Sequence, residues 1–561
     1  MIVWSLNRYF LNWFLLLSFF SLNACDPYEE VQFEIESPEL GQFFPPNIPV
    51  EVKITGKQEQ LNTVLIDDIV TEGVRRNNGN TLLVYKEPAD GLGFVSVAQP
   101  NDPYLAVRSW LQGQFIPAQE WYPNSMVLKL GQQALNEGEG SLAHILKTSL
   151  INVDLSAFVD PISLDLGITQ AQILIGSAMI RDMTLVLNVS EGIVTIKVIL
   201  SPLDIMYHIE SDLIRSQGTG SYQQISFDAE ASLAVSGVTL VNSRMTSDRL
   251  QLNDEQIPSS IISAITDILK DRFEDAITKA IEKVTYQITG QIFSQLRPTL
   301  GIPFLNPINQ QSRISSIEAE QDAISIRFET LISADTSKRS SYYSGALLSP
   351  DLITDMDHSG MGIILGSGLI NQLVYAAWDA GNFDQQSYSK SQLESLGLGE
   401  LSFPYSNLSH ATINLLLPPI LEWTADGPDL LVGGIDIDME IDYSKDTKAW
   451  TAARVPIELF LEEGSLQVRI DWARSIDVKP IMLDRLNQIA DRAEVLKLIN
   501  IALPAVVNDI LSQFPLISVV PFELQGLSNG PRLNIKPLLR FLDTHETHWS
   551  LQIRLQTTNS L

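Results

Sequence analysis

The 561-residue chain contains a single cysteine, Cys25, and few basic residues. One cysteine excludes an internal disulfide and any metal site built from several thiolates. Lysine and arginine total 37 against 67 acidic residues, which gives a net charge of −30 at pH 7. A polyanion is repelled by such a charge, so we expect no nucleic-acid partner.

Beyond residue 25 the chain also lacks the run of about 20 apolar residues that a membrane-spanning helix needs. Hydrophobic residues nevertheless make up 45% of the sequence, which is too many for a mostly disordered chain. Single domains hold about 50 to 250 residues. The length of the chain therefore predicts about three folded domains.

Two segments match the sequence pattern of a reactive site but lack the flanking residues that such a site requires. Residues 526–530 (GLSNG) match a hydrolase nucleophile elbow around Ser528, but NGPR stands where the following helix should begin. The glycines of 360–368 miss the spacing of a dinucleotide loop by one residue. We therefore expect no enzyme activity and no cofactor. An envelope esterase acting through Ser528 is an alternative.

No set of acidic residues and histidines has the spacing of a metal site. Four acidic residues in 436–442 alternate with apolar residues, which predicts one solvated strand face rather than a calcium loop. His545 and His548 lack the four-residue spacing of a zinc-binding helix. We expect no bound metal.

The N-terminus has the features of an export signal. Arg8 precedes an apolar run from Leu11 to Phe20, and small residues follow before Cys25. A positive charge, a short apolar run and a small-residue ending are typical of a secretory signal peptide. We therefore predict a signal peptide over residues 1–24.

The sequence LNAC at 22–25 resembles a bacterial lipobox, in which the cysteine becomes the lipid-bearing first residue of the mature protein. The resemblance implies lipidation of Cys25 and attachment to a membrane through this N-terminal lipid anchor, because two or more acyl chains hold a protein stably on a bilayer. The expected location is the bacterial cell envelope, in the periplasm or at the cell surface. Ordinary secretion with a free thiol at Cys25 is the alternative.

Residues 31–118 alternate between apolar and polar positions and contain frequent turn signals. Val31, Phe33 and Ile35 alternate before a turn at SPELG, and the alternation resumes over 50–54. The pattern predicts an all-β sandwich over 25–118 and resembles the immunoglobulin-like domains of bacterial surface proteins. Its expected role is a spacer or docking module, and its protein partner is unknown.

Longer strands and helices are expected after residue 118. Strict alternation over 225–235 predicts a strand with one buried face. Aliphatic residues recur every three to five positions from Ile261 to Ile292 and predict a helix of about 36 residues, roughly 54 Å long. A strand over 433–443 and a helix over 480–503 repeat this order. We therefore predict two modules, 119–310 and 311–561.

Residues 369–378 (LINQLVYAAW) are apolar or aromatic at eight of ten positions. A surface helix needs only a stripe of roughly 100° to cover its buried side. This segment has more apolar surface than such a stripe, and it therefore needs cover on more than one face.

Four segments carry a family resemblance: 124–155, 364–383 (ILGSGLINQLVYAAWDAGNF), 415–423 (LLLPPILEW) and 503–527. They resemble the tubular lipid-binding (TULIP) superfamily, which includes the bactericidal/permeability-increasing protein. The resemblance implies an α+β fold. An immunoglobulin-like sandwich would be followed by two tubular modules, each a curved antiparallel sheet wrapped around a long helix, with an apolar pocket between helix and sheet.

The implied partner is a phospholipid or another acyl-chain lipid. Transfer of apolar surface out of water stabilises such binding by about 25 cal/mol per Å². Endotoxin binding by charge pairing is not expected, because the chain is acidic and has no cluster of basic residues. The lipid-lining candidates are Leu142, Ile145, Leu146 and Leu150 in the first module and Leu369, Ile370, Leu373, Val374 and Trp378 in the second.

We therefore expect a membrane-anchored bacterial lipoprotein that binds lipids in apolar pockets and stores or transfers them. The alternative is a structural or adhesive envelope lipoprotein whose modules have ordinary packed cores and bind no ligand. A lipid that co-purifies with the native protein would distinguish the two functions.

Overall fold

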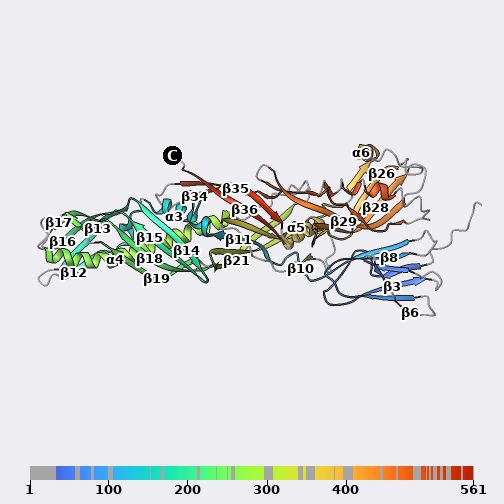
Figure 1. The fold of residues 1–561 in the computed structure, drawn as a ribbon, viewed down its shortest axis with the longest axis horizontal. Helices are drawn as coiled ribbons and strands as arrows, with labels where there is room; N and C mark the ends of the chain where they lie inside the picture. The colour runs from blue at the N-terminus through green and yellow to red at the C-terminus, as the bar shows by residue number, and fades with distance from the viewer. Residues whose placement is uncertain are drawn as a thin grey trace, which may run out of the picture.

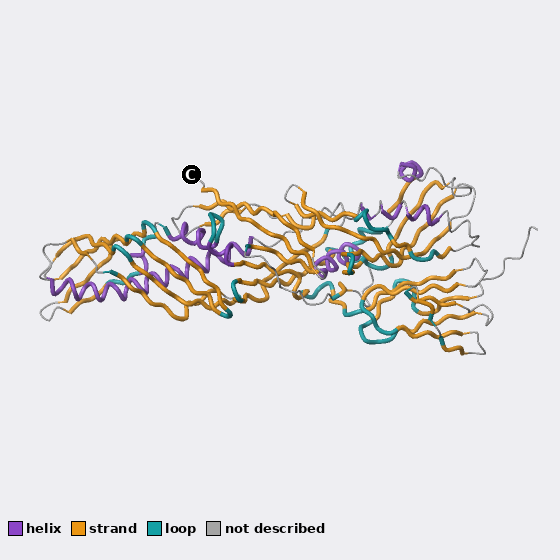
Figure 2. Tube along the Cα trace, viewed as in Figure 1, coloured by secondary structure: helices purple, strands orange, loops and turns teal. Residues whose placement is uncertain are grey.

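The computed structural model shows an elongated molecule (Figure 1) and describes residues 33–559 with internal gaps. Cys25, the signal peptide expected over 1–24, and Ser528 lie outside the described residues. Strands dominate the part of the chain that is described (Figure 2). The gaps of six or more residues are 57–62, 99–104, 296–306, 339–344, 349–359, 396–407, 484–494, 509–514 and 526–531.

Residues 33–112 form two sheets around one shared core. The strands are β1 (Phe33–Ser37), β2 (Gln42–Phe44), β3 (Val50–Gly56), β4 (Thr63–Ile66), β5 (Ile69–Val70), β6 (Val74–Arg76), β7 (Thr81–Lys86), β8 (Gly91–Ala98) and β9 (Leu105–Gln112). Their orders are β1-β3-β7-β6 and β2-β9-β8-β4-β5. Alternate residues of both sheets, among them Val52 and Val95, are buried in one core together with Trp110. The region is all-β as expected, and its assignment as an immunoglobulin-like domain over 25–118 stays a prediction.

The opposite end of the molecule holds two further antiparallel sheets. Their strands are β12 (Ile162–Asp165), β13 (Gln170–Ile180), β14 (Met183–Ser190), β15 (Ile193–Leu200), β16 (Leu203–Ser211), β17 (Arg215–Tyr222), β18 (Ile225–Ala234), β19 (Gly237–Ser247) and β20 (Gln251–Asn253). The orders are β12-β13-β16-β17-β20 and β14-β15-β18-β19. The alternation predicted over 225–235 is confirmed, because Ile225, Phe227 and Ala229 of β18 are buried and the residues between them are not.

The helical elements at this end are α2 (Gln132–Asn136), α3 (Leu142–Leu150), the 3-10 helix η2 (Leu155–Phe158) and α4 (Ser259–Gln295). Ser141 caps α3, because its hydroxyl accepts the backbone N–H of His144 at 3.2 Å. The 37-residue helix α4 confirms the helix expected from Ile261 to Ile292. It buries Phe273 against Tyr222, with ring centroids 6.3 Å apart and an edge-to-face geometry.

A seven-stranded sheet occupies the middle of the molecule (Figure 1). Its strands are β11 (Tyr122–Gly131), β21 (Ile308–Glu320), β22 (Ala323–Ala334), β24 (Met361–Gly366), β34 (Phe522–Gln525), β35 (Arg532–Thr544) and β36 (His548–Asn559). The order is β21-β22-β11-β24-β36-β35-β34. Strand β11 thus pairs with two strands that follow it by about 200 residues, which joins the two halves of the chain.

A nine-stranded sheet lies beside the N-terminal sheets (Figure 1). Its strands are β25 (Gln386–Ser389), β26 (Leu408–Leu415), β27 (Ile420–Thr424), β28 (Gly427–Ile441), β29 (Thr447–Glu462), β30 (Ser465–Ile470), β31 (Asp477–Val478), β32 (Met482–Leu483) and β33 (Pro515–Ser518). A short pair, β10 (Phe115–Pro117) and β23 (Gly345–Leu347), lies apart from it. Helices α5 (Ser367–Asp379) and α6 (Lys390–Ser395) lie in the second half of the chain. Residues 495–500, 502–504 and 507–508 are also helical.

The expected fold class, α+β with each module a curved sheet wrapped around a long helix, is wrong. The described chain is mostly strand, and within 311–561 the helices α5 and α6 have only 13 and 6 residues. The backbone of α4 runs closest to β19, η2 and α3, and β19 is the edge strand of its sheet. In the part of the chain that is described, no sheet is wrapped around a long helix.

The helix predicted over 480–503 is wrong at its first residues, 480–483, and confirmed over 495–500 and 502–503. Residues 484–494 lie outside the described residues. Met482 and Leu483 form strand β32, which pairs with Trp450 and Ala449 of β29. Helical residues begin only at Val495 among those described. The apolar spacing did not show that strand β29 has backbone N–H and C=O groups available for pairing. Met482 and Leu483 form hydrogen bonds with these groups and are therefore strand.

Helix α5 is buried over all 13 of its residues. It packs against β22 and β11 of the seven-stranded sheet and against β23 and β27. The apolar excess of residues 369–378 is thus explained, because this helix has no solvent face. Burial on every side requires apolar side chains all round the helix.

The polar side chains of α5 are satisfied by the sheets around it. Gln372 accepts the Thr330 hydroxyl at 2.7 Å and donates to the Thr330 carbonyl at 3.2 Å. Asn371 accepts the backbone N–H of Leu421 at 2.6 Å. Because Thr330 belongs to β22 and Leu421 to β27, these bonds fix the helix to two different sheets.

We predict that Gly368→Ala destabilises the protein by about 1–3 kcal/mol through overpacking. A Cβ at Gly368 would meet the Tyr122 ring, whose hydroxyl donates to the Leu347 carbonyl at 3.0 Å. Denaturant unfolding measures the effect. Gly176→Ala is the control, since a Cβ there meets His208 at an ordinary 3.4 Å. A midpoint for Gly368→Ala equal to that of the control would contradict this packing.

Strand β28 carries the acidic residues predicted to form a solvated face. Asp438 pairs with Lys448 at 2.8 Å, and Glu440 is exposed. Asp436 departs from the prediction, because its Oδ1 is buried without a hydrogen-bond partner among the described residues. Burial, and secondly the charge of Asp438, raise the pKa of the Asp436 carboxyl.

We predict that Asp436→Asn raises the melting temperature at pH 7 by about 1–2 °C. With its pKa raised in the folded state, the wild-type carboxyl favours folding fully only below its unfolded pKa, near 4, and loses this contribution as pH rises. The gain should therefore vanish near pH 3.5. Asp438→Asn is the control and should give no gain, because it removes the ion pair with Lys448. A gain independent of pH would refute the titration of Asp436 as its cause.

Candidate functional site

The nine lipid-lining candidates lie on two helices, α3 and α5, in the main hydrophobic core. Eight of them are buried, and Leu142 is partly buried against the same core. Their side chains therefore pack among neighbouring side chains. None of the nine lines the cavity that the structure describes, and a lipid-lining role for them stays a prediction.

A cavity of about 1150 Å³ lies where the N-terminal sheets meet the end of α5. We call it the junction cavity. Exposed residues such as Pro45, Gln119 and Asp335 surround it, so it opens to solvent. Its lining comes from four segments and consists of Phe43, Phe44, Pro45, Pro46, Gly113, Gln114, Phe115, Pro117, Ala118, Gln119, Glu120, Ser333, Ala334, Asp335, Ser337, Tyr375 and Asp379.

Aromatic rings in contact with one another form a layer along part of the lining of the junction cavity. Phe43 contacts Phe115 edge-on, with centroids 5.2 Å apart and planes at 73°. The Trp378 ring lies 6.3 Å from Phe43 and 5.8 Å from Tyr375. Trp378, a predicted candidate, therefore supports two rings that line the cavity without lining it itself.

Local turns place these residues at the cavity. Phe115 is held by the pairing of β10 with β23, in which Ile116 lies opposite Ala346. Helix α5 ends in a turn where Gly381, with φ of +75°, donates to the Trp378 carbonyl at 2.9 Å. Glycine adopts this left-handed conformation without strain. The end of the helix thereby presents Tyr375 and Asp379, one turn apart, to the cavity.

The N-terminal wall of the cavity is fixed by docking of β8 and β9 on β28. The Ser109 hydroxyl accepts the backbone N–H of Gly434 at 2.8 Å. Gly433 lies against Leu92, where a Cβ would meet the leucine methyl. Leu111 packs with Leu417, Ile420 and Leu431 in a small apolar cluster. These contacts join residues more than 300 positions apart in the sequence.

Acidic residues on the cavity lining are Glu120, Asp335 and Asp379. Asp379 is only 5% exposed. Its Oδ1 accepts the Ser337 hydroxyl at 2.5 Å, and its backbone carbonyl accepts the Lys338 N–H at 2.8 Å. The Oδ1 atom of Asp335 accepts the Asn309 amide at 3.1 Å. The cavity thus combines an aromatic layer with carboxylates.

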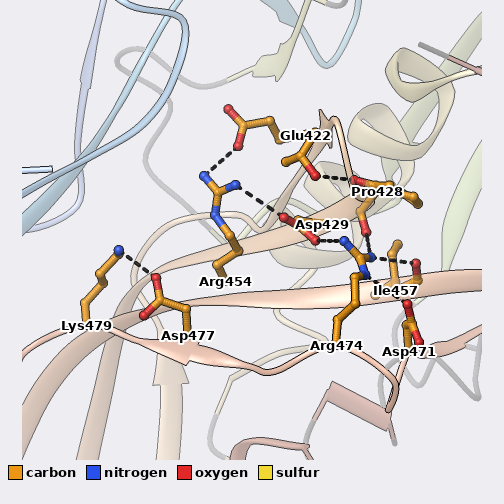
Figure 3. A network of polar contacts seen from close by, with 11 residues as sticks. Glu422, Pro428, Asp429, Arg454, Ile457, Asp471, Arg474, Asp477 and Lys479 are labelled. Carbon is orange, nitrogen blue, oxygen red and sulfur yellow. Dashed lines mark hydrogen bonds and ion pairs between the residues drawn. The ribbon is translucent and has the colours of Figure 1, made fainter. Parts of the chain in front are cut away.

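A cluster of ion pairs connects strands of the nine-stranded sheet (Figure 3). Asp429, 5% exposed, accepts Arg474 Nη1 at 2.8 Å and Arg454 Nη1 at 3.3 Å. Arg454 also pairs with Glu422 at 2.8 Å, and Arg474 pairs with Asp471 at 2.9 Å. Each guanidinium is thus neutralised by two carboxylates. The cluster ties β27, β28 and β29 together and holds no nucleophile.

Within the described residues, no group of three His, Cys, Asp or Glu side chains is placed to hold a metal ion. None of the described helices combines the length and the hydrophobicity of a membrane-spanning segment. The junction cavity is our candidate ligand site, because it combines aromatic rings with carboxylates in a solvent-open space.

Most of the residues that line the cavity could not be predicted from the sequence. Phe43, Phe115 and Tyr375 come from three separate segments, and only the fold brings them together. The apolar excess of segment 369–378 is the one sequence feature that pointed to this region, because Tyr375 lies within the segment and Asp379 follows it directly. No periodicity connects that segment to residues 43–46.

Comparison with known proteins gives limited information. No protein-family model matches the chain, and no curated protein matches it. Among solved structures it is similar to a lipopolysaccharide binding protein, with a TM-score of 0.40, 11% identity, and coverage of 77% of this chain and 99% of that chain. It is also similar to P47 of Clostridium botulinum E1, with a TM-score of 0.24, 9% identity and the same coverage. TM-scores of this size do not place the chain in a family.

Proposed function

We propose that this protein is a non-catalytic, lipid-anchored binding protein of the bacterial cell envelope that holds an acyl-chain lipid in the junction cavity. The observation that carries the proposal is a solvent-open cavity of about 1150 Å³ with an aromatic layer along part of its lining. Pockets for small ligands occupy roughly 300–1000 Å³ and are lined mainly by hydrophobic and aromatic groups. The cavity is large enough for a lipid chain and part of its headgroup.

Burial of a chain against these rings supplies enough free energy for binding. Each methylene removed from water contributes about 0.8 kcal/mol. A chain with ten buried methylenes therefore gains roughly 8 kcal/mol, part of which offsets the loss of freedom on binding. Phe43, Phe115 and Tyr375 provide rigid surface for this contact, since they are already held by packing and strand pairing.

The expected lipid anchor lies close in sequence to the cavity. Phe33 follows Cys25 by eight positions, a distance of at most roughly 28 Å in an extended chain. The N-terminal sheets, which supply Phe43 and Phe44, would therefore lie near the bilayer surface. Such a position supports the exchange of a lipid between the membrane and the cavity, and transfer of that lipid is part of the proposal.

We predict that protein extracted under native conditions carries lipid detectable by mass spectrometry. Phe115→Ala should lower the amount of bound lipid several-fold, because it removes one ring of the aromatic layer. Tyr85→Ala is the control and should leave the lipid content unchanged, since Tyr85 is 51% exposed and lies outside the cavity lining. Absence of lipid from the wild type, together with no uptake of a fluorescent fatty acid, would refute lipid binding.

We predict that Cys25→Ser moves the protein from the membrane fraction to the soluble fraction, because the acylated thiol is lost. Cell fractionation followed by immunoblotting measures this shift. Ser21→Ala, a change that keeps the cysteine, serves as the control. A Cys25→Ser protein that stays in the membrane fraction to the same extent as this control would exclude the lipid anchor.

A further inference from the structure

The charged side chains that line the junction cavity are all acidic. Its lining contains Glu120, Asp335 and Asp379, and no lysine or arginine is among the lining residues. Glu120 and Asp335 are exposed, so water screens their charges. Asp379 differs, because it is 95% buried and lies at the end of a fully buried helix.

The carboxylate of Asp379 is only partly satisfied by the protein. Its Oδ1 accepts the Ser337 hydroxyl, and no hydrogen bond or ion pair from the described residues reaches Oδ2. Oδ2 is not among the buried atoms that lack a partner, so it keeps contact with solvent. Buried carboxylates in proteins are normally paired with a cation or fully hydrogen-bonded. An unpaired oxygen on a carboxylate that lines a cavity is therefore a place for a cationic group of a ligand.

The nearest basic residue in the sequence does not supply this cation. Lys338 is exposed, and its Nζ comes within 3.0 Å of the point where a Cβ would lie on Gly381. The Asp384 carboxylate comes within 2.9 Å of the same point. Lys338 thus lies beside Asp384, and no ion pair joins it to Asp379 among the described residues.

The aromatic layer adds a second preference for a cation. A positive group near the face of an aromatic ring is attracted by the electron density of the ring, and ammonium ligands are commonly bound among aromatic rings. Tyr375 lies one helical turn before Asp379, and both line the cavity. An ammonium group at Asp379 would therefore lie close to the aromatic layer, while its apolar chain extends along the rings.

We propose that the junction cavity selects amphiphiles with an ammonium headgroup and disfavours those with an anionic headgroup. Asp379 binds the ammonium group, Glu120 and Asp335 attract it at longer range, and the layer of Phe43, Phe115 and Tyr375 holds the chain. This inference rests on the proposed lipid binding and specifies its ligand. An aminolipid of the envelope is the source to which the proposal commits.

The test compares three ligands that carry the same dodecyl chain, below their micelle concentrations. Dodecyltrimethylammonium is the cation, dodecyl maltoside the neutral ligand and dodecyl phosphate the anion. Isothermal titration with the delipidated full chain measures each affinity. We expect the cation to bind at least tenfold more tightly than the anion, since a charge-assisted hydrogen bond or ion pair of this kind changes affinity by roughly 10- to 100-fold.

Site variants distinguish binding of the cation in the cavity from its general attraction to a chain with net charge −30. Asp379→Asn keeps the size of the side chain and an oxygen for Ser337, and it should weaken the cation about tenfold or more without changing the neutral ligand. The double variant Glu120→Gln, Asp335→Asn should weaken it about two- to fivefold. Glu191→Gln, on an exposed turn outside the cavity lining, is the matched control and should have no effect. Circular dichroism checks the fold of each variant.

The outcomes are distinct. Equal affinity for all three ligands would overturn the headgroup preference and leave the proposed lipid binding intact. Failure of all three to bind would overturn both. An equal loss in Asp379→Asn and Glu191→Gln would assign the preference to net charge and overturn the site.

The source of the ammonium group is tested separately. Binding of tetramethylammonium as tight as that of the dodecyl compound would overturn a lipid as the source. Preferential uptake of phosphatidylethanolamine over phosphatidylglycerol from mixed vesicles, lost in Asp379→Asn, would support it.

Discussion

Complete burial of helix α5 is the constraint on which the arrangement of the second half depends. A helix covered on every side must meet several sheets at once, and α5 packs on β22, β11, β23 and β27. Its two central amides, Asn371 and Gln372, bond to strands of two different sheets. The helix therefore sets the separation of these sheets. Its C-terminal turn, fixed in this way, presents Tyr375 and Asp379 at a defined place on the surface.

Local pattern predicted the elements of this fold better than their arrangement. Alternation identified β18, and aliphatic spacing identified α4, because each depends on one face being buried. The same spacing predicted a helix over 480–503, which is confirmed from Val495 onward but wrong at Met482 and Leu483, whose pairing with β29 could not be seen in the sequence. The expected wrapping of a sheet around a long helix failed for a related reason: which sheet covers a helix is decided by pairing between distant segments.

The candidate site shows this limit most clearly. The apolar excess at 369–378 correctly indicated a helix buried on more than one face. The candidates chosen there are buried in the main core and do not line the junction cavity, so their lipid-lining role stays a prediction. The residues that line the cavity include polar and proline positions that carry no apolar periodicity. Basic residues are concentrated elsewhere, as in the pairs of Arg454 and Arg474 with Asp429. This distribution leaves the carboxylate of Asp379 without a cation from the described chain.

The docking of the N-terminal sheets on β28 has a thermodynamic consequence. Because the cavity lining combines Phe43 of the N-terminal sheets with Tyr375 of α5, separation of these two parts abolishes the site. Ligand binding and the association of the two parts are then thermodynamically linked. Each event must change the equilibrium constant of the other by the same factor. Occupancy of the cavity would clamp the two parts of the molecule together, and any force that pulls them apart would expel the ligand.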